Sequence, residues 1–255
     1  MKPKTTTDLH WDHRARSEAD IAKVNIADTV QRDLELQFIF KHLNSVNRVL
    51  EVGCGNGYVT SQLRDRAAHV DAFDFSENMI SRAKELYGER NNRFFHDSVL
   101  DPRVEKASYD TIICVRVLIN LQNLQEQVTA LRNMAGLLKK GGKLILMEGF
   151  KDGFDELSSL RTKAGLEPLK PAAINYYSSL SEFLPSVMEQ FAIADTFHTG
   201  MFDFLTRVIY PILVGTQNSG EPGEFHSKIE PVVRSDAGIE FTRFARLHGF
   251  ALIKR

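Results

Sequence analysis

Cysteine is scarce in this sequence. The 255 residues include only two, Cys54 and Cys114, and each lies in an apolar or glycine-rich run. Two cysteines cannot form the disulfide framework of a small secreted protein. We therefore expect two buried thiols in a reduced, cytoplasmic protein.

An excess of charge of one sign is also missing. Lys and Arg number 32 and Asp and Glu 33, for a formal net charge of −1. Proteins that bind nucleic-acid phosphates usually carry a basic surplus, so the balance argues against a nucleic-acid partner.

Long apolar stretches are absent as well. No run approaches the roughly 18 apolar residues of a membrane span. The first residues also lack the apolar core of a signal peptide. We therefore expect no membrane insertion.

Tryptophan occurs once and phenylalanine 17 times. Eleven of those phenylalanines lie at or beyond Phe150, in well under half of the chain. Small-molecule pockets are lined mainly by apolar and aromatic side chains. The late segment is therefore a candidate wall of an acceptor pocket.

The chain from residue 48 onward alternates short apolar runs with helical patterns. Strands are expected at 48–52, 70–73, 93–96, 110–115, 143–147, 191–198 and 250–253. Helices are expected at 58–67, 76–87 and 124–138, with Ser76 as an N-cap, and later at 155–163, 181–190, 202–213 and 235–247. Strands joined by helical crossovers predict an α/β fold, a doubly wound, Rossmann-like, seven-stranded sheet.

Two flanking segments complete the predicted organisation. Residues 1–45 are expected to form an N-terminal helical lid over the cofactor, with candidate contacts at Trp11, Arg14, Asn25 and Arg32. Residues 46–255 form the main domain. Its segment from about 150 to 247 is a C-terminal helical insertion that covers the substrate, with a loop-rich stretch at 215–231.

A glycine-rich turn follows the first predicted strand. Glu51 precedes Gly53, Gly55 and Gly57, which permit a sharp turn and close approach of a ligand. A dinucleotide fingerprint requires its third glycine at position 58, where Tyr58 stands. Glu51 also disfavours a pyrophosphate. The turn therefore favours a cofactor with a cationic part over a nicotinamide dinucleotide.

Several further motifs have the order and spacing of one known family. They are Tyr109-Asp110 and the stretches at 49–57, 74–79, 96–98 and 137–144. Residues from about Val49 to Glu148 thus resemble class I S-adenosylmethionine-dependent methyltransferases. The resemblance implies a methyltransferase domain at 46–255 and S-adenosylmethionine as cofactor.

The resemblance also implies which residues bind the cofactor. Asp74 would accept hydrogen bonds from the ribose hydroxyls, or act only as a turn carboxylate. Phe75 and Met79 would flank the adenine, or simply pack. The full set is Glu51, Gly53, Gly55, Gly57, Asp74, Phe75, Met79, Asp97, Ser98, Val115 and Arg116.

Two of these positions carry specific expectations. Asp97, beside Ser98, would accept a hydrogen bond from the adenine amino group, unless it is an ordinary loop acid. Arg116 directly follows a buried strand and needs a partner, so it either reaches the methionine part or pairs with Glu148 or Glu51.

Two family features are missing. The stretch Val115-Arg116-Val117-Leu118 lacks the Asn/Asp-Pro-Pro-Tyr motif of methyltransferases that act on exocyclic base or amide nitrogens. The acidic trio of magnesium-dependent catechol-type enzymes is also missing, so we expect no metal.

The acceptor side is less defined. We expect a small molecule methylated at oxygen or nitrogen, with His198 as candidate general base and His10, His13 and Glu148 as competitors. Tyr177 and Arg207 are candidate substrate contacts; Arg207 is suited to a phosphate or carboxylate.

Three short stretches also resemble small-molecule methyltransferases of envelope-glycan and natural-product pathways. They lie at 116–121, 175–177 and 207–211. The alternatives are an RNA or protein methyltransferase, or a methyltransferase-like binding protein without catalysis. The oligomeric state is not predicted.

Overall fold

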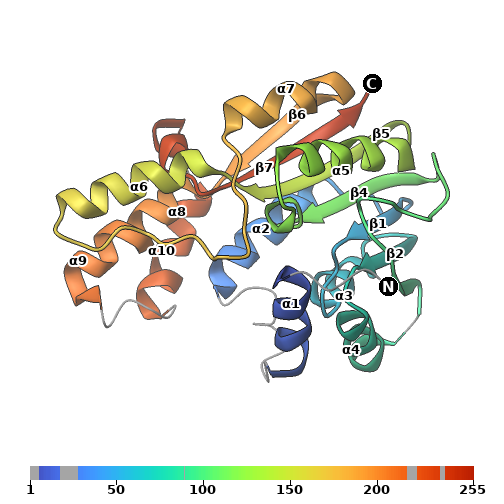
Figure 1. Cartoon of the computed structure of the whole chain (residues 1–255), viewed down its shortest axis with the longest axis horizontal. Helices are drawn as coiled ribbons and strands as arrows, with labels where there is room; N and C mark the ends of the chain where they lie inside the picture. The colour runs from blue at the N-terminus through green and yellow to red at the C-terminus, as the bar shows by residue number, and fades with distance from the viewer. Residues whose placement is uncertain (1–5, 18–27, 89, 217–222, 236–238) are drawn as a thin grey trace.

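The chain folds around one seven-stranded sheet with the strand order β3-β2-β1-β4-β5-β7-β6 (Figure 1). The computed structural model describes residues 6–17, 28–88, 90–216, 223–235 and 239–255. The strands are β1 Arg48–Val52, β2 His69–Asp74, β3 Asn92–His96, β4 Tyr109–Val115, β5 Leu138–Gly149, β6 Phe191–His198 and β7 Leu247–Lys254. Strands β1 to β5 pair in parallel, whereas β7 runs antiparallel to β5 and to β6.

Helices cover both faces of this sheet, as its buried strands require. Leu50, Ile112 and Leu144, on neighbouring strands, have no exposed surface, and such continuous apolar runs are typical of parallel strands. The α-helices are α1 Thr6–Ser17, α2 Thr29–Lys41, α3 Tyr58–Leu63, α4 Glu77–Tyr87, α5 Leu124–Leu137, α6 Lys151–Lys163, α7 Leu180–Gln190, α8 Gly200–Phe204, α9 Tyr210–Val214 and α10 Glu224–Ser235. The predicted fold class is confirmed.

Two apolar clusters hold the layers together. Met134 of α5 and Phe183 of α7 share one cluster with Leu50 of the sheet. Ile39 of α2 and Leu63 of α3 belong to the other cluster. Both cysteines are buried and free, as expected. Among the described residues, no helix has the length and apolar character needed to cross a membrane.

Helix α1 lies against α4, at the carboxyl end of β2 (Figure 1). Ser76 caps α4 as predicted, because its side chain accepts a hydrogen bond from the Met79 N–H. The same hydroxyl donates to Asp12 of α1 at 2.7 Å. Ala15 of α1 packs on Met79. These contacts hold α1 beside the strand end expected to carry the cofactor's ribose.

The segment between β5 and β7 gathers α6, α8, α9 and α10 at one end of the molecule (Figure 1). The helix expected at 202–213 is divided into α8, a π-helical turn η3 at Leu205–Ile209, and α9. The helix expected at 235–247 is a 3-10 turn, η5, at Ile239–Phe244, followed by β7.

The stretch expected as loop at 215–231 contains the first part of α10. Pro231, the last residue of that stretch, lies inside this helix. Ile229 and Val233, on either side of it, pack on Phe202 of α8. Tertiary packing of an apolar face therefore outweighs the local cost of the proline.

A buried carboxylate ties four strands together at a site away from any predicted function. Asp71 of β2 is 1% exposed and accepts hydrogen bonds from Tyr109 Oη at 2.8 Å, Arg48 Nη2 at 3.0 Å and Arg93 Nε at 2.9 Å. His69 Nε2 lies 3.1 Å from Asp71 Oδ1, the oxygen that also accepts from Arg93. These partners come from β1, β2, β3 and β4.

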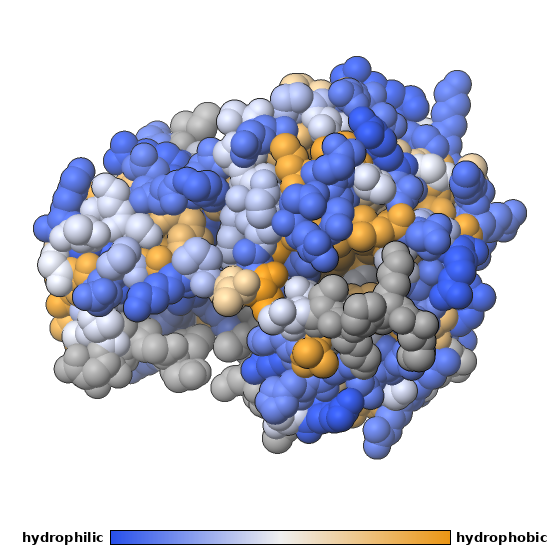
Figure 2. Space-filling model, viewed as in Figure 1, coloured by the Kyte–Doolittle hydropathy of each residue, from blue (hydrophilic) through white to orange (hydrophobic). Residues whose placement is uncertain are grey.

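The surface seen in the view of Figure 1 is mostly hydrophilic. Figure 2 shows orange apolar side chains surfacing near the middle of this face, with blue hydrophilic side chains around them. Isolated apolar residues on a surface are normal, but a gathered patch marks an opening or a contact region.

Candidate functional site

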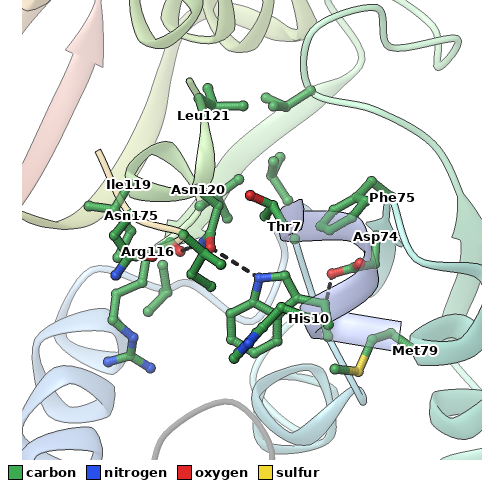
Figure 3. Close-up of a pocket in the computed structure, with 18 of the residues that line it drawn as sticks. Thr7, His10, Asp74, Phe75, Met79, Arg116, Ile119, Asn120, Leu121 and Asn175 are labelled. Atoms are coloured by element: carbon green, nitrogen blue, oxygen red, sulfur yellow. Dashed lines mark hydrogen bonds between the residues drawn. The ribbon is translucent and has the colours of Figure 1, made fainter. Parts of the chain in front are cut away.

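A cavity of about 610 Å³ opens at the carboxyl ends of the parallel strands. Ligands of doubly wound sheets bind at this edge, where neighbouring crossovers go to opposite faces. The cavity brings together most of the predicted site residues (Figure 3): Glu51, Gly53, Gly55, Asp74, Phe75, Met79, Asp97, Ser98, Val115, Arg116, Tyr177 and Arg207.

The glycine-rich turn forms the floor of this cavity. Gly53 and Gly55 have φ values of +70° and +54°, which a glycine adopts without strain. A Cβ at Gly53 would lie 2.4 Å from a methyl carbon of Val117. The backbone N–H groups of Gly53 and Cys54 both donate to the Phe73 carbonyl, which fixes the turn against β2.

Gly57 is the one predicted turn glycine outside the described lining of the cavity. Its φ is +80°, and a Cβ there would approach the Phe94 ring to 2.9 Å and Ala83 to 3.0 Å. Gly57 therefore starts α3 close to β3 and α4, and contributes to the site only through the shape of the turn.

Asp74 ends β2 with its carboxylate at the cavity wall. Its two oxygens accept hydrogen bonds from Gly55 N and Ser76 N, each at 2.9 Å. Burial raises the pKa of Asp74 to about 6, although these backbone hydrogen bonds oppose the shift. Because each carboxylate oxygen has two lone pairs, both can still accept from ligand hydroxyls.

Glu51 provides a second buried carboxyl at the same edge. It is 3% exposed and accepts a hydrogen bond from the Thr60 hydroxyl. Burial raises the pKa of Glu51 to about 8, and the nearby charge of Asp74 adds to the rise. A cation entering the cavity would favour the ionised form, so the site is suited to a cationic ligand.

Asp97 lines the cavity but is already well bonded by its own loop. It accepts from Ser98 N and Arg103 N, each at 2.9 Å, and is 3% exposed. Phe75 and Met79 line the cavity near Asp74, on the side of α1 (Figure 3). Contact of these residues with an adenine stays a prediction.

Arg116 pairs with a residue that sequence reasoning did not identify. Its Nη1 lies 2.5 and 2.6 Å from the two carboxylate oxygens of Glu35 on α2. The alternative of a salt bridge to a carboxylate is confirmed, but the partner is Glu35 rather than Glu148 or Glu51. Arg116 also has a left-handed backbone, with φ +52°, and donates its N–H to the Met147 carbonyl at 2.7 Å. A non-glycine residue in this conformation is strained and turns the chain sharply after β4.

Glu148 stabilises that turn from the neighbouring strand. Its carboxylate accepts from Leu118 N at 2.7 Å and from Ile119 N at 3.3 Å, at the start of a 3-10 turn, η2, that spans Leu118–Asn120. Burial raises the pKa of Glu148 to about 7. Glu148 is not among the described lining residues, so its position does not support a role as base.

His198 is also absent from the described lining of the cavity. Its Nε2 lies 3.1 Å from Thr242 Oγ1, and its Nδ1 accepts from Gly200 N at 3.3 Å. The physical reason is that β6 is the outermost strand, two places from β5. His198 thus lies outside the described lining, and its role as general base stays a prediction.

Helix α1 closes one side of the cavity. Trp11 Nε1 donates to Asn120 Oδ1 at 3.0 Å, which joins α1 to the turn after β4 (Figure 3). Thr7 and His10 line the same side, whereas Arg14 and His13 do not. Arg32 of α2 also lines the cavity, with its guanidinium 4.1 Å from the Tyr58 ring centroid. Asn25 lies outside the described residues.

The far end of the cavity contains polar residues that the sequence analysis missed. Gln31 and Asp28 come from the start of α2, His226 from α10, and Arg246 from the residue before β7. None belongs to a motif. Only the three-dimensional packing of the late segment on α2 brings them together.

Comparison with known protein families shows a match for part of the chain. Residues 49–142 match a family model described as a methyltransferase domain. A malonyl-[acyl-carrier protein] O-methyltransferase from Bacillus anthracis is 35% identical over 116 residues, which are 45% of this chain and 42% of that protein. A ubiquinone biosynthesis O-methyltransferase from Xanthomonas euvesicatoria pv. vesicatoria is 32% identical over 102 residues, which are 39% of this chain and 41% of that protein. The match thus spans about two fifths of the length of these relatives.

Solved structures share the fold over almost the whole chain. The N-methyltransferase NodS from Bradyrhizobium japonicum, in complex with S-adenosyl-l-homocysteine, has a TM-score of 0.63 at 14% identity and covers 98% of this chain and 99% of that chain. The magnesium protoporphyrin IX methyltransferase from Synechocystis has a TM-score of 0.58 at 20% identity and covers 98% and 95%. The stretch that matches the family model, residues 49–142, is the part of the chain in which the sequence analysis found the motifs of the methyltransferase family.

Proposed function

We propose that this chain, which carries a class I S-adenosylmethionine-dependent methyltransferase domain, transfers a methyl group to an oxygen or nitrogen of a small molecule. One observation supports this most directly. A single cavity is lined at one end by Gly53, Gly55 and Asp74, and at the other by Tyr177 and Arg207. The cofactor and the acceptor thus fit side by side in one space of a size usual for ligand sites, about 300–1,000 Å³.

The residues present fit the cofactor. Asp74 presents free lone pairs to the ribose hydroxyls, Phe75 and Met79 offer apolar surface to the adenine, and the buried Glu51 favours a cation. When bound, S-adenosylmethionine supplies a methyl group on a sulfonium sulfur. Transfer of that methyl group would leave S-adenosylhomocysteine and would require the acceptor oxygen or nitrogen to lose its proton.

The protein contributes mainly alignment and exclusion of water. Helix α1 covers the cofactor end, where Trp11 is bonded to Asn120, and we propose that residues 1–45 act as a lid. The segment from about 150 to 247 would hold the acceptor. We assign no general base, because a phenol or a neutral amine needs little help to lose its proton in such a displacement.

The proposal includes a cytoplasmic location, no metal and no nucleic-acid partner. An envelope-glycan or natural-product intermediate is the acceptor class that the short stretches at 116–121, 175–177 and 207–211 favour. An RNA or protein acceptor, and a non-catalytic binding protein, are the competing functions. The following measurements separate them.

Calorimetry with S-adenosylmethionine, S-adenosylhomocysteine and NAD tests the cofactor. We expect micromolar binding of both sulfur compounds and none of NAD. A methyl-donor assay against sugars, sugar nucleotides, phosphates, aromatic metabolites, RNA and protein then tests the acceptor. NAD binding without a response to the sulfur compounds would sink the proposal, and transfer to RNA or protein alone would favour the competing enzyme.

The affinity for S-adenosylmethionine should rise with pH. Glu51, with its pKa raised to about 8, is largely protonated at pH 6 to 7 in the free protein. A bound cation favours the carboxylate, so binding releases a proton and weakens by up to about tenfold per pH unit below pH 8. Titration calorimetry at pH 6, 7 and 8.5, in buffers of different ionisation enthalpy, measures both effects.

The matched control is Glu51→Gln, which cannot ionise. It should bind more weakly than the wild type at pH 8.5 and lose most of the pH dependence. A wild-type dissociation constant that does not change between pH 6 and 8.5 would show that Glu51 does not face the cationic part of the cofactor.

A further inference from the structure

Two arginines from separate parts of the late segment meet at the acceptor end of the cavity. Arg207 lies in the turn η3, and Arg246 directly precedes β7; both line the cavity. Burying a guanidinium group costs free energy unless the group is paired. The partners of each arginine within the fold therefore show which part of its guanidinium remains for a ligand.

Arg246 is paired with the carboxylate of Asp203. Asp203, which has no exposed surface, accepts from Arg246 Nε at 2.8 Å and from Arg246 N at 3.0 Å. The Thr199 hydroxyl also donates to Asp203, at 2.5 Å, so that carboxylate is used within the fold. The outer Nη2 of Arg246 reaches Gln31, itself a lining residue, at 3.3 Å. The outer end of the guanidinium therefore lies at the cavity wall.

Arg207 is less fully neutralised. Its Nη2 donates to Asp28 Oδ2 at 3.2 Å, but Asp28 also caps α2 by accepting from Gln31 N at 3.0 Å. The Nε of Arg207 is buried and has no hydrogen-bond partner among the described residues. Burial lowers the pKa of Arg207 to about 10, and the neighbouring charge of Arg246 lowers it further. An anion in the cavity would stabilise the charged guanidinium and so oppose both the burial and the repulsion by Arg246.

The charges around Arg207 include more arginines than carboxylates. The positive charges of Arg246 and Arg161 act on Arg207, and the carboxylates Asp203 and Asp28 oppose them. The region thus has a surplus of positive charge at the acceptor end of the cavity.

His226 adds a neutral donor beside these arginines. Burial lowers its pKa and outweighs the opposing charge of Asp28, and the charge of Arg207 adds to the lowering, so the ring is uncharged near neutral pH. Its Nδ1 accepts from Gly223 N at 3.2 Å, which leaves the ring proton on Nε2. The histidine is therefore a hydrogen-bond donor rather than a base.

We propose that the methyl acceptor carries an oxyanion, a carboxylate or a phosphate, which Arg207 and Arg246 bind at the end of the cavity away from Asp74. This inference rests on the proposed methyl transfer. The guanidinium fork matches either anion with two parallel hydrogen bonds. When the anionic group is held at this end, the rest of a small acceptor points along the cavity toward the cofactor end.

The test uses the full chain saturated with S-adenosylhomocysteine, titrated with inorganic phosphate and, separately, with acetate at constant ionic strength. We expect one of them to bind, and Arg207→Gln to weaken that binding at least about tenfold. Arg207→Lys, which keeps the charge but loses the fork, should have an intermediate effect. The matched control is Arg132→Gln: Arg132 is a half-exposed arginine on α5 that does not line the cavity.

Tighter binding of phosphate identifies a phosphate acceptor, and tighter binding of acetate a carboxylate acceptor. Retained binding of S-adenosylhomocysteine shows that each variant is folded. If S-adenosylhomocysteine binds but neither anion binds below about 10 mM, or if Arg207→Gln and Arg132→Gln behave alike, the inference is overturned and the proposed function stands. If the wild type does not bind S-adenosylhomocysteine, the proposed function fails and this inference fails with it.

Discussion

Replacing Asp74 by alanine should weaken binding of S-adenosylhomocysteine at least about 100-fold, because each hydrogen bond to a charged group contributes about 1.5–3 kcal/mol. Two effects add in this variant. The proposed bonds to the ribose hydroxyls disappear, and Gly55 N and Ser76 N lose the acceptor that orients the glycine-rich turn. Titration calorimetry measures the affinity, and circular dichroism shows whether the variant is folded.

Two further variants sharpen this experiment. Asp74→Asn keeps one oxygen acceptor but turns an NH₂ toward a backbone donor, so its affinity should fall between wild type and Asp74→Ala. Asp101→Ala is the matched control, because Asp101 is exposed and does not line the cavity. Equal affinities for Asp74→Ala and Asp101→Ala would place the ribose elsewhere.

Asp71→Ala should lower the free energy of unfolding by about 3 kcal/mol at pH 7. Arg48, Arg93 and His69 are partly exposed and can turn to water once the carboxylate is gone. The Tyr109 hydroxyl cannot, because that residue is 1% exposed, so it is left buried without its acceptor. Urea unfolding of the wild type and the variant measures the difference, with exposed Asp65→Ala as control.

The effect of Asp71 should depend on pH. Burial alone would raise the pKa of Asp71, but hydrogen bonds from Tyr109 and Arg48 outweigh it and hold the pKa below the usual value. The stabilisation is therefore complete above the unfolded pKa of about 3.9 and is lost as pH falls through the lower folded value. The difference in the free energy of unfolding between wild type and Asp71→Ala should become smaller below pH 4. A difference in the free energy of unfolding that stays constant down to pH 3 would contradict this account.

The sheet and its cofactor edge could be predicted because both are encoded locally. Short apolar runs mark the strands, and the residues after them, such as Gly53 and Asp74, need only the topology to be placed at one edge. The cavity contains most of these residues. Gly57 shows the limit, because its positive φ and the close approach of Phe94 already call for a glycine whether or not a ligand is near.

The acceptor end was poorly predicted because it depends on contacts between distant segments. Arg116 pairs with Glu35 across 81 positions, and Arg246 meets Gln31 across 215. No local pattern records such pairs. His198 ends a strand, as predicted, but this strand is the outermost one of the sheet and His198 does not belong to the described lining of the cavity.

The position of β7 has a consequence for how the chain folds as it leaves the ribosome. This strand is last in sequence, yet it lies between β5 and β6 and pairs with both. Until Leu247–Lys254 has been synthesised, β5 keeps an open edge and β6 has no strand beside it among those described. Chains are made from the N-terminus, and open strand edges favour aggregation. The acceptor segment therefore cannot be locked in place until synthesis reaches these residues, and a nascent chain that stops short of them carries an unprotected sheet.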